Sequence, residues 1–513
     1  VRTTRALAEG VLAHATDASK AAVVVGYDGR PSSRTLAEAA AGVLLAAGVS
    51  VHWFEQATPT PVVAYAARVM ATAAAIVITA SHNPREDNGL KVYGSDFIQL
   101  GAAGAAEVAA RREGIGPAAA IACIDFPAQS VGTASARASV VPAALFEQYL
   151  GELDASLPPR RQKNALRIAY TPLHGLGFAP VSAALKRRGF DELHAVAEQA
   201  EPDGEFPTVP FPNPELPDTL ERVLALARTV QADLVLANDP DVDRLAAAAP
   251  LPDGDFYVLS GNELGVLLAD FVLEHTPARP QPLLVTSIVS SPLVMKVAVA
   301  HGARAERTLT GFKWIWAAAR ALEQAESLRF AFGCEEALGY SIGGAVRDKD
   351  GISAAVWLAE LCSTLRGETL LERLHALYRR HGAWSSAQRS LAFPGRAGAR
   401  DLASCIERLS AGAPSSLLGH ELQRSTDYRS GAEGRPPWLG ATSLFELDYG
   451  ALGRVLVRPS GTEPKLKLYA DTEEPVTAAE PVAAAVQRAR ARAEALTAAL
   501  ASWLQAPASG GAA

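Results

Sequence analysis

A strand, a polar loop, a helix, a glycine and a second strand follow one another in the same order at three places in this chain. The first unit runs from Ala22 to Phe54, the second begins at Leu166, and the third begins at Leu283. Any α/β protein contains some units of this kind, but the matching polar loops favour an internal repeat. We therefore predict three α/β domains of related plan, each with a loop at the carboxyl end of a strand, where ligands usually bind.

The length of 513 residues also requires more than one hydrophobic core and suggests about three or four domains. A Pro/Arg/Gln-rich stretch from Gly151 to Lys163 predicts a connection, and a second boundary falls before the apolar helix expected from Glu263 to Leu273. From about His381 the composition changes to a Gly/Pro/Ser-rich region, and a helix is expected from Thr477 to Leu504. We expect α/β domains at residues 1–150, 164–260 and 261–380, an α+β domain at 381–505, and a disordered tail at 506–513.

The composition is that of an ordinary soluble protein, with 49% hydrophobic and 20% charged residues. The net charge of −7 argues against a nucleic-acid surface, so any phosphate site must be built locally. The four cysteines are widely separated and show no metal-binding spacing. No stretch approaches the roughly 20 apolar residues of a membrane span. We expect a cytoplasmic protein, a monomer or weak dimer, that binds small molecules rather than nucleic acid or membrane.

The most informative single stretch runs from Ile76 to Tyr93. A short apolar run that predicts a buried strand is followed by a loop of small and hydrogen-bonding residues, with Ser81 at its tip and Lys91 ten positions further on. Ser81 is a candidate nucleophile. Because a serine hydroxyl is a weak nucleophile at neutral pH, this interpretation requires a nearby base and a cation that holds the transferred group.

Three carboxylates, Asp239, Asp241 and Asp243, stand at alternate positions directly after an apolar strand and are followed by Arg244. Such a loop can direct three oxygen ligands at one Mg²⁺. The alternative is a solvated turn, but three like charges that follow a buried strand favour the metal. Calcium is disfavoured, because the loop lacks the longer ligand series of an EF-hand.

A second small-residue loop follows the strand at Val455 to Arg458. The guanidinium of Arg458, the hydroxyls of Ser460 and Thr462 and the backbone N–H groups opened by Gly461 predict a cradle for a phosphate that does not react. The alternative is an ordinary Pro/Gly turn with exposed basic residues. The clustering of donors at the turn favours the cradle, to which we also assign Lys467.

In the third unit, polar loops at 308–313 and 333–340 lie beside apolar strands. Adjacent glutamates, Glu335 and Glu336, suit a pair of sugar hydroxyls, because one carboxylate can accept two hydrogen bonds. A surface acidic pair is the alternative, and the apolar Leu-Gly-Tyr that follows favours the binding loop. We add Thr310, Gly311 and Lys313 to this predicted sugar site.

Two histidines, His82 and His174, lie in loops with candidate chemistry. For His82 we favour hydrogen bonding within the loop over base catalysis, because it adjoins Ser81 and is poorly placed to aim at it. We assign His82, His174, Asn83 and Arg30 to loop support.

Four motifs occur together and in order: Thr79 to Pro84, Asp239 to Arg244, the loop of Glu335 and Glu336, and Arg458 to Pro464. In this the chain resembles the α-D-phosphohexomutases over nearly its whole length, and most closely their phosphoglucomutase branch, which includes phosphopentomutases and glucose-1,6-bisphosphate synthase. The resemblance implies an α/β fold of three related α/β/α domains with mixed sheets and a C-terminal α+β domain, around a central cleft.

The resemblance also implies roles for the residues. Ser81 would be the phosphoserine, and it would join Asp239, Asp241 and Asp243 in the set around Mg²⁺. Lys91 and Arg244 would assist phosphoryl transfer, with Lys91 as an acid or base only if its pKa is lowered. Glucose 1,6-bisphosphate would be the activator and intermediate. The distal phosphate would be held by Arg458, Ser460, Gly461 and Thr462.

Two departures from the family pattern matter. Many members carry a serine where this chain has Ala337, so one hydroxyl contact to the sugar is absent. The family's amino-terminal segment of the Gly-Leu-Arg-Gly type, which brings an arginine into the active site, has no counterpart before Val1. We expect that a segment upstream is missing and that turnover is impaired without it.

The resulting hypothesis is a mutase that interconverts glucose 1-phosphate and glucose 6-phosphate through phospho-Ser81. Phosphomannomutase or phosphopentomutase activity at the same site stays open. A metal-dependent sugar phosphatase would also use Asp and Mg²⁺, but it needs no distal cradle. A non-catalytic sugar-phosphate-binding protein is the third alternative.

Overall fold

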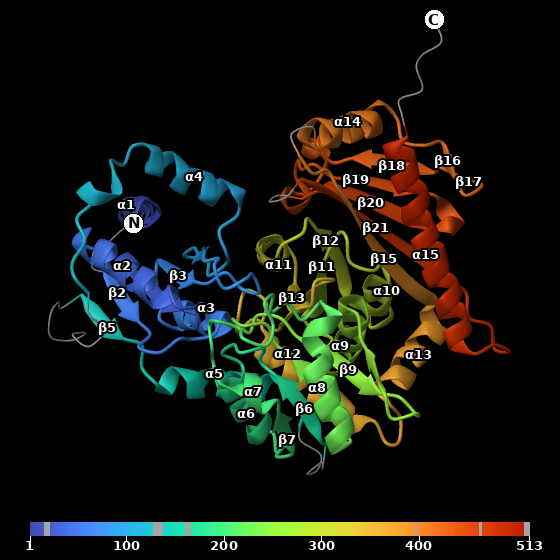
Figure 1. The fold of residues 1–513 in the computed structure, drawn as a ribbon, viewed down its shortest axis with the longest axis horizontal. Coiled ribbons are helices and arrows are strands. Elements are labelled where there is room, and N and C mark those ends of the chain that lie inside the picture. Colours follow the sequence, from blue (N-terminus) through green and yellow to red (C-terminus); the bar gives the residue numbers. More distant parts are fainter. Residues whose placement is uncertain (15–20, 127–136, 160–165, 396–397, 461–463, 507–513) are drawn as a thin grey trace, which may run out of the picture.

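Four large sheets, each with its own helices, follow one another along the chain (Figure 1). The computed structural model describes residues 1–14, 21–126, 137–159, 166–395, 398–460 and 464–506. We call the regions around these sheets the first to fourth domains. In Figure 1 the blue first domain lies on one side and the orange and red fourth domain on the other, with the second and third between them. The predicted fold class, three α/β domains and a C-terminal α+β domain, is confirmed.

The first sheet has the strand order β4-β3-β1-β2-β5 and is parallel except for β4, which runs antiparallel to β3. Strands β1 and β3 are continuous apolar runs because helices cover both faces of the sheet. The antiparallel edge strand brings Lys91 back beside the end of β3. The elements are α1 (Arg2–His14), β1 (Ala22–Tyr27), α2 (Ser33–Ala46), β2 (Ser50–Trp53), α3 (Thr60–Val69), β3 (Ala74–Ile78), β4 (Leu90–Tyr93), α4 (Ala102–Glu113), η2 (Ala118–Ala120), β5 (Ala138–Val140) and α5 (Ala144–Ser156).

The predicted connection from Gly151 is wrong over its first six residues, since α5 continues to Ser156. Leu145, Tyr149 and Leu153 bury one face of this helix at a spacing of four residues, and Gly151 lies off that face, where a helix tolerates glycine at modest cost. The helix ends shortly before Pro158 and Pro159, which lack the N–H groups that a helix interior requires.

The second sheet repeats the plan of the first. Strands β6, β7 and β8 are parallel, and β9 runs antiparallel to β8, so the loop with the three aspartates is the turn between β8 and β9. The strand order is β10-β9-β8-β6-β7. The elements are β6 (Ile168–Thr171), α6 (Phe178–Arg187), β7 (Leu193–Ala195), α7 (Ala197–Ala200), α8 (Pro217–Val230), β8 (Leu234–Ala237), β9 (Ala246–Pro250) and β10 (Phe256–Val258).

The third sheet repeats the plan again, with the order β12-β11-β13-β14 and β14 antiparallel to β13. The loop of Glu335 and Glu336 is therefore the turn between these two strands. The elements are α9 (Gly261–His275), β11 (Gln281–Ser287), α10 (Leu293–Ala300), β12 (Arg304–Thr308), α11 (Phe312–Ala325), β13 (Leu328–Glu335), β14 (Gly339–Ile342), α12 (Gly351–Thr364) and α13 (Leu370–His381).

The fourth domain is an antiparallel sheet of order β15-β21-β20-β19-β18, on which the long helix α15 packs (Figure 1). Within the Gly/Pro/Ser-rich region lies a helix, α14, whose apolar residues Leu402, Cys405 and Leu409 recur at helical spacing. The C-terminal residues 507–513 lie outside the described residues. The elements are β15 (Ala383–Ala392), α14 (Gly398–Ala411), β16 (Ser416–Leu417), β17 (His420–Glu421), β18 (Arg424–Asp427), η4 (Ala432–Gly434), η5 (Pro437–Leu439), β19 (Phe445–Asp448), η6 (Gly450–Leu452), β20 (Arg454–Pro459), β21 (Lys465–Glu474) and α15 (Val482–Gln505).

None of the helices in the described ranges is both long and apolar enough to cross a membrane.

Candidate active site

The predicted nucleophile, metal ligands and glutamate pair lie in three hairpin turns with a shared conformation. Each tip joins a parallel strand to an antiparallel neighbour, and each contains one non-glycine residue in the left-handed region: Ser81 at φ 51°, Val242 at φ 65° and Leu338 at φ 62°. A β-branched residue such as Val242 rarely adopts a positive φ. Strained backbone of this kind persists where surrounding contacts hold it, and it concentrates at functional sites.

Ser81 faces the loop of the three aspartates. Its Oγ donates a hydrogen bond of 2.9 Å to Oδ2 of Asp239, 158 positions away in the sequence. Its backbone N–H donates to the hydroxyl of Thr79 at 2.8 Å, which fixes the turn. The structure thus brings together the predicted nucleophile and the predicted metal loop across a domain boundary.

Arg30, from the loop after β1, holds the Ser81 turn in place. Its guanidinium donates hydrogen bonds to the backbone carbonyls of Ser81 and Asn83, at 2.8 and 2.7 Å, and to those of Pro84 and Asp87, at 2.6 and 3.2 Å. The side chain of Asn83 bonds to Asp87 within the same loop. The predicted support of this loop by Arg30 therefore has a direct geometric basis.

The three aspartates form a buried cluster. One carboxylate oxygen from each of Asp239, Asp241 and Asp243 lies within 4.8 Å of the others. The Oδ1 atoms of Asp241 and Asp243 are buried without a hydrogen-bond partner, which is costly unless a cation satisfies them. These residues therefore fit a small oxygen-preferring cation such as Mg²⁺.

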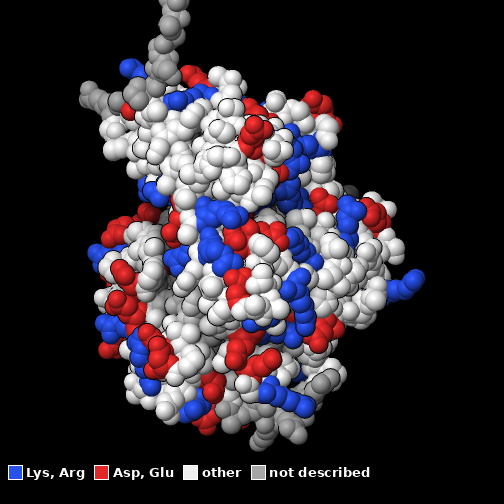
Figure 2. Space-filling model, turned by 90° about the vertical axis from the view of Figure 1, so that its right-hand side faces the viewer, with Lys and Arg blue, Asp and Glu red and all other residues white. Residues whose placement is uncertain are grey.

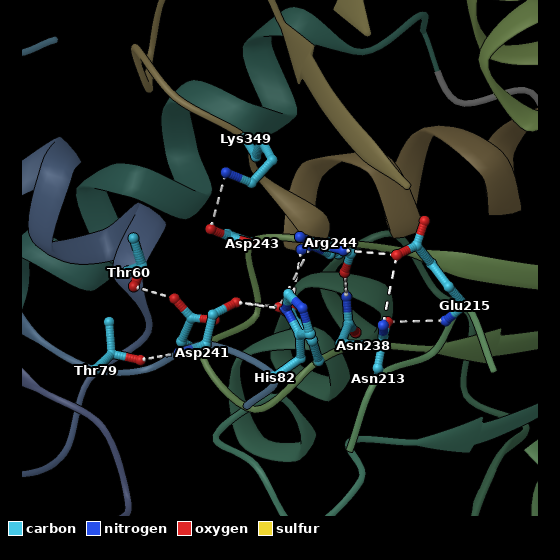
Figure 3. A network of polar contacts seen from close by, with 12 residues as sticks. Thr60, Thr79, His82, Asn213, Glu215, Asn238, Asp241, Asp243, Arg244 and Lys349 are labelled. Carbon is cyan, nitrogen blue, oxygen red and sulfur yellow. Dashed lines mark hydrogen bonds and ion pairs between the residues drawn. The ribbon is translucent and has the colours of Figure 1, made fainter. Parts of the chain in front are cut away.

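Cationic side chains from three domains lie beside this cluster, and Figure 3 shows two of them, Arg244 and Lys349. Lys91 Nζ lies 2.6 Å from Asp241 Oδ2 and 2.7 Å from Asp243 Oδ2. Lys349 Nζ lies 3.1 Å from the same oxygen of Asp243. Arg244 lies 3.2 Å from Glu215 and 3.9 Å from Asp239. Three cationic groups thus lie around the aspartates, one of which Ser81 contacts, and cations in such a place can stabilise a transferring phosphoryl group.

The ionisation of the cluster follows from burial and mutual charge. Burial and the neighbouring Asp243 and Asp241 raise the pKa of Asp239 well above its usual value. Burial would lower the pKa of Lys91, but Asp241, Asp243 and Asp348 outweigh it and raise that pKa. The charges of these aspartates therefore hold Lys91 as an ammonium group in this arrangement.

His82 is partly buried beside Ser81, with its Nδ1 3.2 Å from Ser81 Oγ. Burial, and then the charge of Arg244, lower the pKa of His82 to about 3. Its ring is therefore neutral at physiological pH and packs edge-on against Phe211. His174 lies in the loop after β6, where its Nε2 bonds to the hydroxyl of Thr208 at 2.8 Å.

The glutamate loop lies beside the metal loop. Leu245 N–H donates to the carbonyl of Leu338 at 3.0 Å, which ties the two turns together. Glu335 accepts a hydrogen bond from the N–H of Gly311, and Glu336 accepts one from Ser287 Oγ at 2.9 Å. Thr310 and Lys313 are partly buried at the start of α11. The predicted sugar residues therefore lie together.

The predicted phosphate cradle is only partly within the described residues, since Gly461 and Thr462 lie outside them. Arg458 and Lys467 are direct neighbours across β20 and β21, and the backbone of Ser460 bonds to that of Lys465 at 2.8 Å. The Nε atom of Arg458 is buried without a partner, and Arg458 is near enough to Glu336 to affect its pKa. The fourth domain thus turns a cation toward the glutamate loop.

A cavity of about 550 Å³ adjoins this region and is lined by residues of the second, third and fourth domains, Glu215 and Glu336 among them. Glu215 and Lys349 were missed by the sequence analysis as site residues. A signal for Lys349 was present, because Asp348, Lys349 and Asp350 form a charged triplet directly before the apolar helix α12.

Comparison with known families accounts for all four domains. Four family descriptions match in order. They are the phosphoglucomutase/phosphomannomutase α/β/α domains I, II and III, at residues 1–116, 147–251 and 260–381, and the C-terminal domain of the same family, at residues 445–489. A relative from Haemophilus influenzae, named a probable phosphomannomutase, is 34% identical over 461 residues, which are 88% of this chain and 87% of the relative. The chain belongs to the phosphoglucomutase/phosphomannomutase family.

Other members of the family show the range of their substrates. The phosphopentomutase of Mus musculus is 32% identical over 502 residues, 92% of this chain and 80% of the mouse protein. The structure of parafusin from Paramecium, described as a phosphoglucomutase, superposes with a TM-score of 0.72 at 17% identity and covers 98% of this chain and 91% of parafusin. At that identity the match shows a common fold.

Proposed function

We propose that this protein interconverts glucose 1-phosphate and glucose 6-phosphate through a phosphoserine at Ser81 and a bound glucose 1,6-bisphosphate. The observation that carries the proposal is the contact of Ser81 Oγ with Asp239, 2.9 Å apart, inside a ring of cations from three domains. Family membership supports the same reaction class. The alternatives at the same site are mannose and pentose phosphates.

Mg²⁺ would be held by Asp239, Asp241 and Asp243, together with Ser81. When bound, it would supply positive charge that neutralises the oxygens of the transferring phosphoryl group. Lys91 and Lys349 already neutralise the carboxylates on their other edge. Arg244 extends from the same loop toward Glu215. The Nε atom of Arg244 is buried without a hydrogen-bond partner.

In the transfer, the bond between phosphorus and Ser81 Oγ would break as a bond to the free hydroxyl oxygen of the sugar phosphate forms, and the proton of that hydroxyl would end on Oγ, which becomes the hydroxyl of Ser81. Negative charge then develops on Oγ, and the ammonium group of Lys91 is a nearby cation that can stabilise it. Arg30 keeps Oγ in place through the four backbone carbonyls. In-line positioning of this kind supplies much of the rate enhancement of phosphoryl transfer.

Glu335 and Glu336 would bind sugar hydroxyls, and Arg458, Ser460, Gly461, Thr462 and Lys467 would bind the phosphate that does not react. A mutase needs such a second phosphate site because both ends of the sugar must occupy it in turn. A phosphatase has no use for it. The buried, unpartnered Nε atom of Arg458 supports an anion at this position.

We further infer that the protein acts on small phosphosugars in the cytoplasm, as a monomer or weak dimer. On the face shown in Figure 2, acidic and basic side chains are interspersed, whereas a nucleic-acid surface gathers basic residues. Light scattering behind size-exclusion chromatography would measure the assembly, and a stable tetramer would contradict this inference.

A coupled assay of glucose 1-phosphate conversion, with Mg²⁺ and with or without glucose 1,6-bisphosphate, tests the function. We expect turnover that the bisphosphate stimulates, and lower kcat/KM with mannose 1-phosphate and ribose 1-phosphate. Release of free phosphate would instead indicate a phosphatase, and binding without turnover would indicate a sugar-phosphate-binding protein.

Ser81→Ala tests the carrier directly. We expect this variant to lose at least roughly a thousandfold in kcat, as removal of a nucleophile does in other enzymes. Intact-mass spectrometry after bisphosphate treatment should find one added phosphoryl group on the wild type and none on the variant. Ser95→Ala, in an exposed turn of the same domain, is the matched control.

A further inference from the structure

Lys349 stands between two aspartates, and each of these carboxylates accepts a hydrogen bond from a buried tyrosine of the first domain. Tyr93 OH donates to Asp348 Oδ2 at 2.6 Å. Tyr149 OH donates to Asp350 Oδ2 at 2.8 Å. Tyr93 lies on β4 and Tyr149 on α5, so two separate elements of the first domain hold the same short segment of the third.

Both tyrosines are fixed donors. Their rings are completely buried. Burial, and then the adjacent carboxylate, raise the pKa of each tyrosine well above its usual value, so the hydroxyls stay protonated. Asp350 is itself held in place, because its Oδ1 caps α12 by accepting the N–H groups of Ile352 and Ser353.

The side chain of Lys349 is confined along its length. Its ammonium group lies 5.4 Å from the centre of the Phe312 ring, and a Cβ on Gly339 would lie only 2.6 Å from its Cδ atom. The stem therefore packs closely against Gly339, and its end lies beside Phe312. At its end, Nζ lies 3.1 Å from Asp243, and Figure 3 shows the two side chains pointing toward one another.

Tyr93 is also linked to the first domain's own contribution to the site. It lies two residues after Lys91 on β4, so both side chains project from the same face of the strand. Lys91 reaches the same Asp243 oxygen as Lys349 does. One face of β4 thus carries Lys91 itself and, through Tyr93, also holds the backbone segment that carries Lys349.

We propose that Tyr93 and Tyr149 are positioning residues that act through Lys349. By holding Asp348 and Asp350, they fix the segment between them so that the ammonium group of Lys349 faces the aspartate loop. The first domain thereby sets the position of a cation that belongs to the third. This inference rests on the proposed phosphoryl-transfer function, in which Lys349 neutralises charge beside Ser81.

The test is a pair of double-mutant cycles on kcat/KM for glucose 1-phosphate. We expect Tyr93→Phe and Tyr149→Phe each to lower kcat/KM roughly tenfold, since each leaves a buried carboxylate short of one hydrogen bond. In a Lys349→Met background, the same substitutions should change the remaining activity less than about twofold, because the group through which they act is gone. If the substitutions merely loosened the fold, they would lower kcat/KM by the same factor in the wild-type and the Lys349→Met backgrounds.

Tyr65→Phe is the matched control. Tyr65 is equally buried in the first domain and donates to a carboxylate, that of Glu152, at 2.9 Å, in a contact that does not involve Lys349. Its effect should be the same with Lys349 or Met at position 349. Thermal unfolding of every variant checks the fold, and if Tyr93→Phe does not fold, the Tyr149→Phe cycle decides alone.

Effects of the tyrosine substitutions that are equal in both backgrounds, or absent in both, overturn the inference while leaving the mutase intact. A full-length wild-type protein without turnover of any of the three sugar phosphates overturns the proposed function, and the inference falls with it.

Discussion

The guanidinium of Arg30 lies 3.1 Å from the carboxylate of Asp28, and the two side chains are 0% and 1% exposed. The remaining N–H groups of the same guanidinium bind the carbonyls of the Ser81 turn. The buried ion pair of Arg30 and Asp28 therefore stabilises the backbone conformation of the turn that contains Ser81. Burial would be costly for an arginine without so many acceptors.

We predict that Arg30→Lys lowers kcat by about a hundredfold, because an ammonium group cannot form the planar fork that spans these carbonyls and small misplacements of reacting groups are costly. KM should change less. Steady-state kinetics on the variant would measure both, with Arg34→Lys, exposed in the same region, as the control. A variant with unchanged kcat would contradict the role of Arg30.

We predict that Mg²⁺ raises the thermal unfolding temperature of the wild type, because ligands that bind only the folded protein stabilise it. Asp241→Asn should weaken Mg²⁺ binding at least roughly tenfold by removing one ionic ligand. Calorimetric titration with Mg²⁺ measures the affinity. Asp253→Asn, on an exposed turn of the same domain, should bind as the wild type does, and equal affinities of Asp241→Asn and the wild type would refute the assignment.

Glu336 should give the enzyme a pH-dependent affinity for its sugar. Burial, and then the charge of Glu335, raise the pKa of Glu336 to about 7. Below that pH the group is a neutral acid, and above it a carboxylate that accepts two hydroxyl donors. KM for the sugar phosphate should therefore fall as the pH rises through about 7.

Glu336→Gln should remove this step, whereas Glu326→Gln, exposed in the same domain, should keep it. The stability of the folded protein should move in the opposite direction. Since the native state holds a proton that the unfolded state releases between about pH 4.5 and 7, this group's contribution to stability falls as the pH rises through that window. Denaturant unfolding at several pH values would detect the difference between wild type and variant.

We predict that Gly351→Ala disturbs the metal loop from the third domain. A Cβ at this position would lie 2.4 Å from the carbonyl oxygen of Arg244 and 2.7 Å from that of Val242, so the backbone of one domain must move. Mg²⁺ affinity and kcat should both fall. Gly344→Ala, where a Cβ meets no atom within 4 Å, is the control and should behave as the wild type.

The sequence was sufficient for the residues whose chemistry depends on their own side chains. The hydroxyl of Ser81 and the alternating carboxylates after β8 are visible in the chain itself, and the structure brings them within hydrogen-bond distance. The three-fold repeat was also predicted. The repeat pattern did not reveal which of its loops carry the candidate catalytic residues. These residues lie in the turn that leads into the antiparallel strand of each domain, and not in the loop after the first strand.

The contacts between domains were beyond sequence reasoning. Tyr93 and Asp348 are 255 positions apart, and neither stands in a motif that names its partner. The acceptors of Arg30 are backbone carbonyls, which every residue has. The role of Lys91 also depended on geometry, since the three aspartates that raise its pKa come from the second and third domains.

The first loop of each domain supports the hairpin tip of the same domain. Arg30 donates to the carbonyl of Ser81, the N–H of Leu176 donates to the carbonyl of Pro240, and Ser287 donates to Glu336. Each tip is therefore supported from within its own domain, while Leu245 also bonds the metal turn to the glutamate turn. An engineer who exchanges residues 333–340 for those of a relative with another sugar preference should transplant residues 287–291 with them, and should keep a residue at position 338 whose carbonyl can accept the N–H of Leu245.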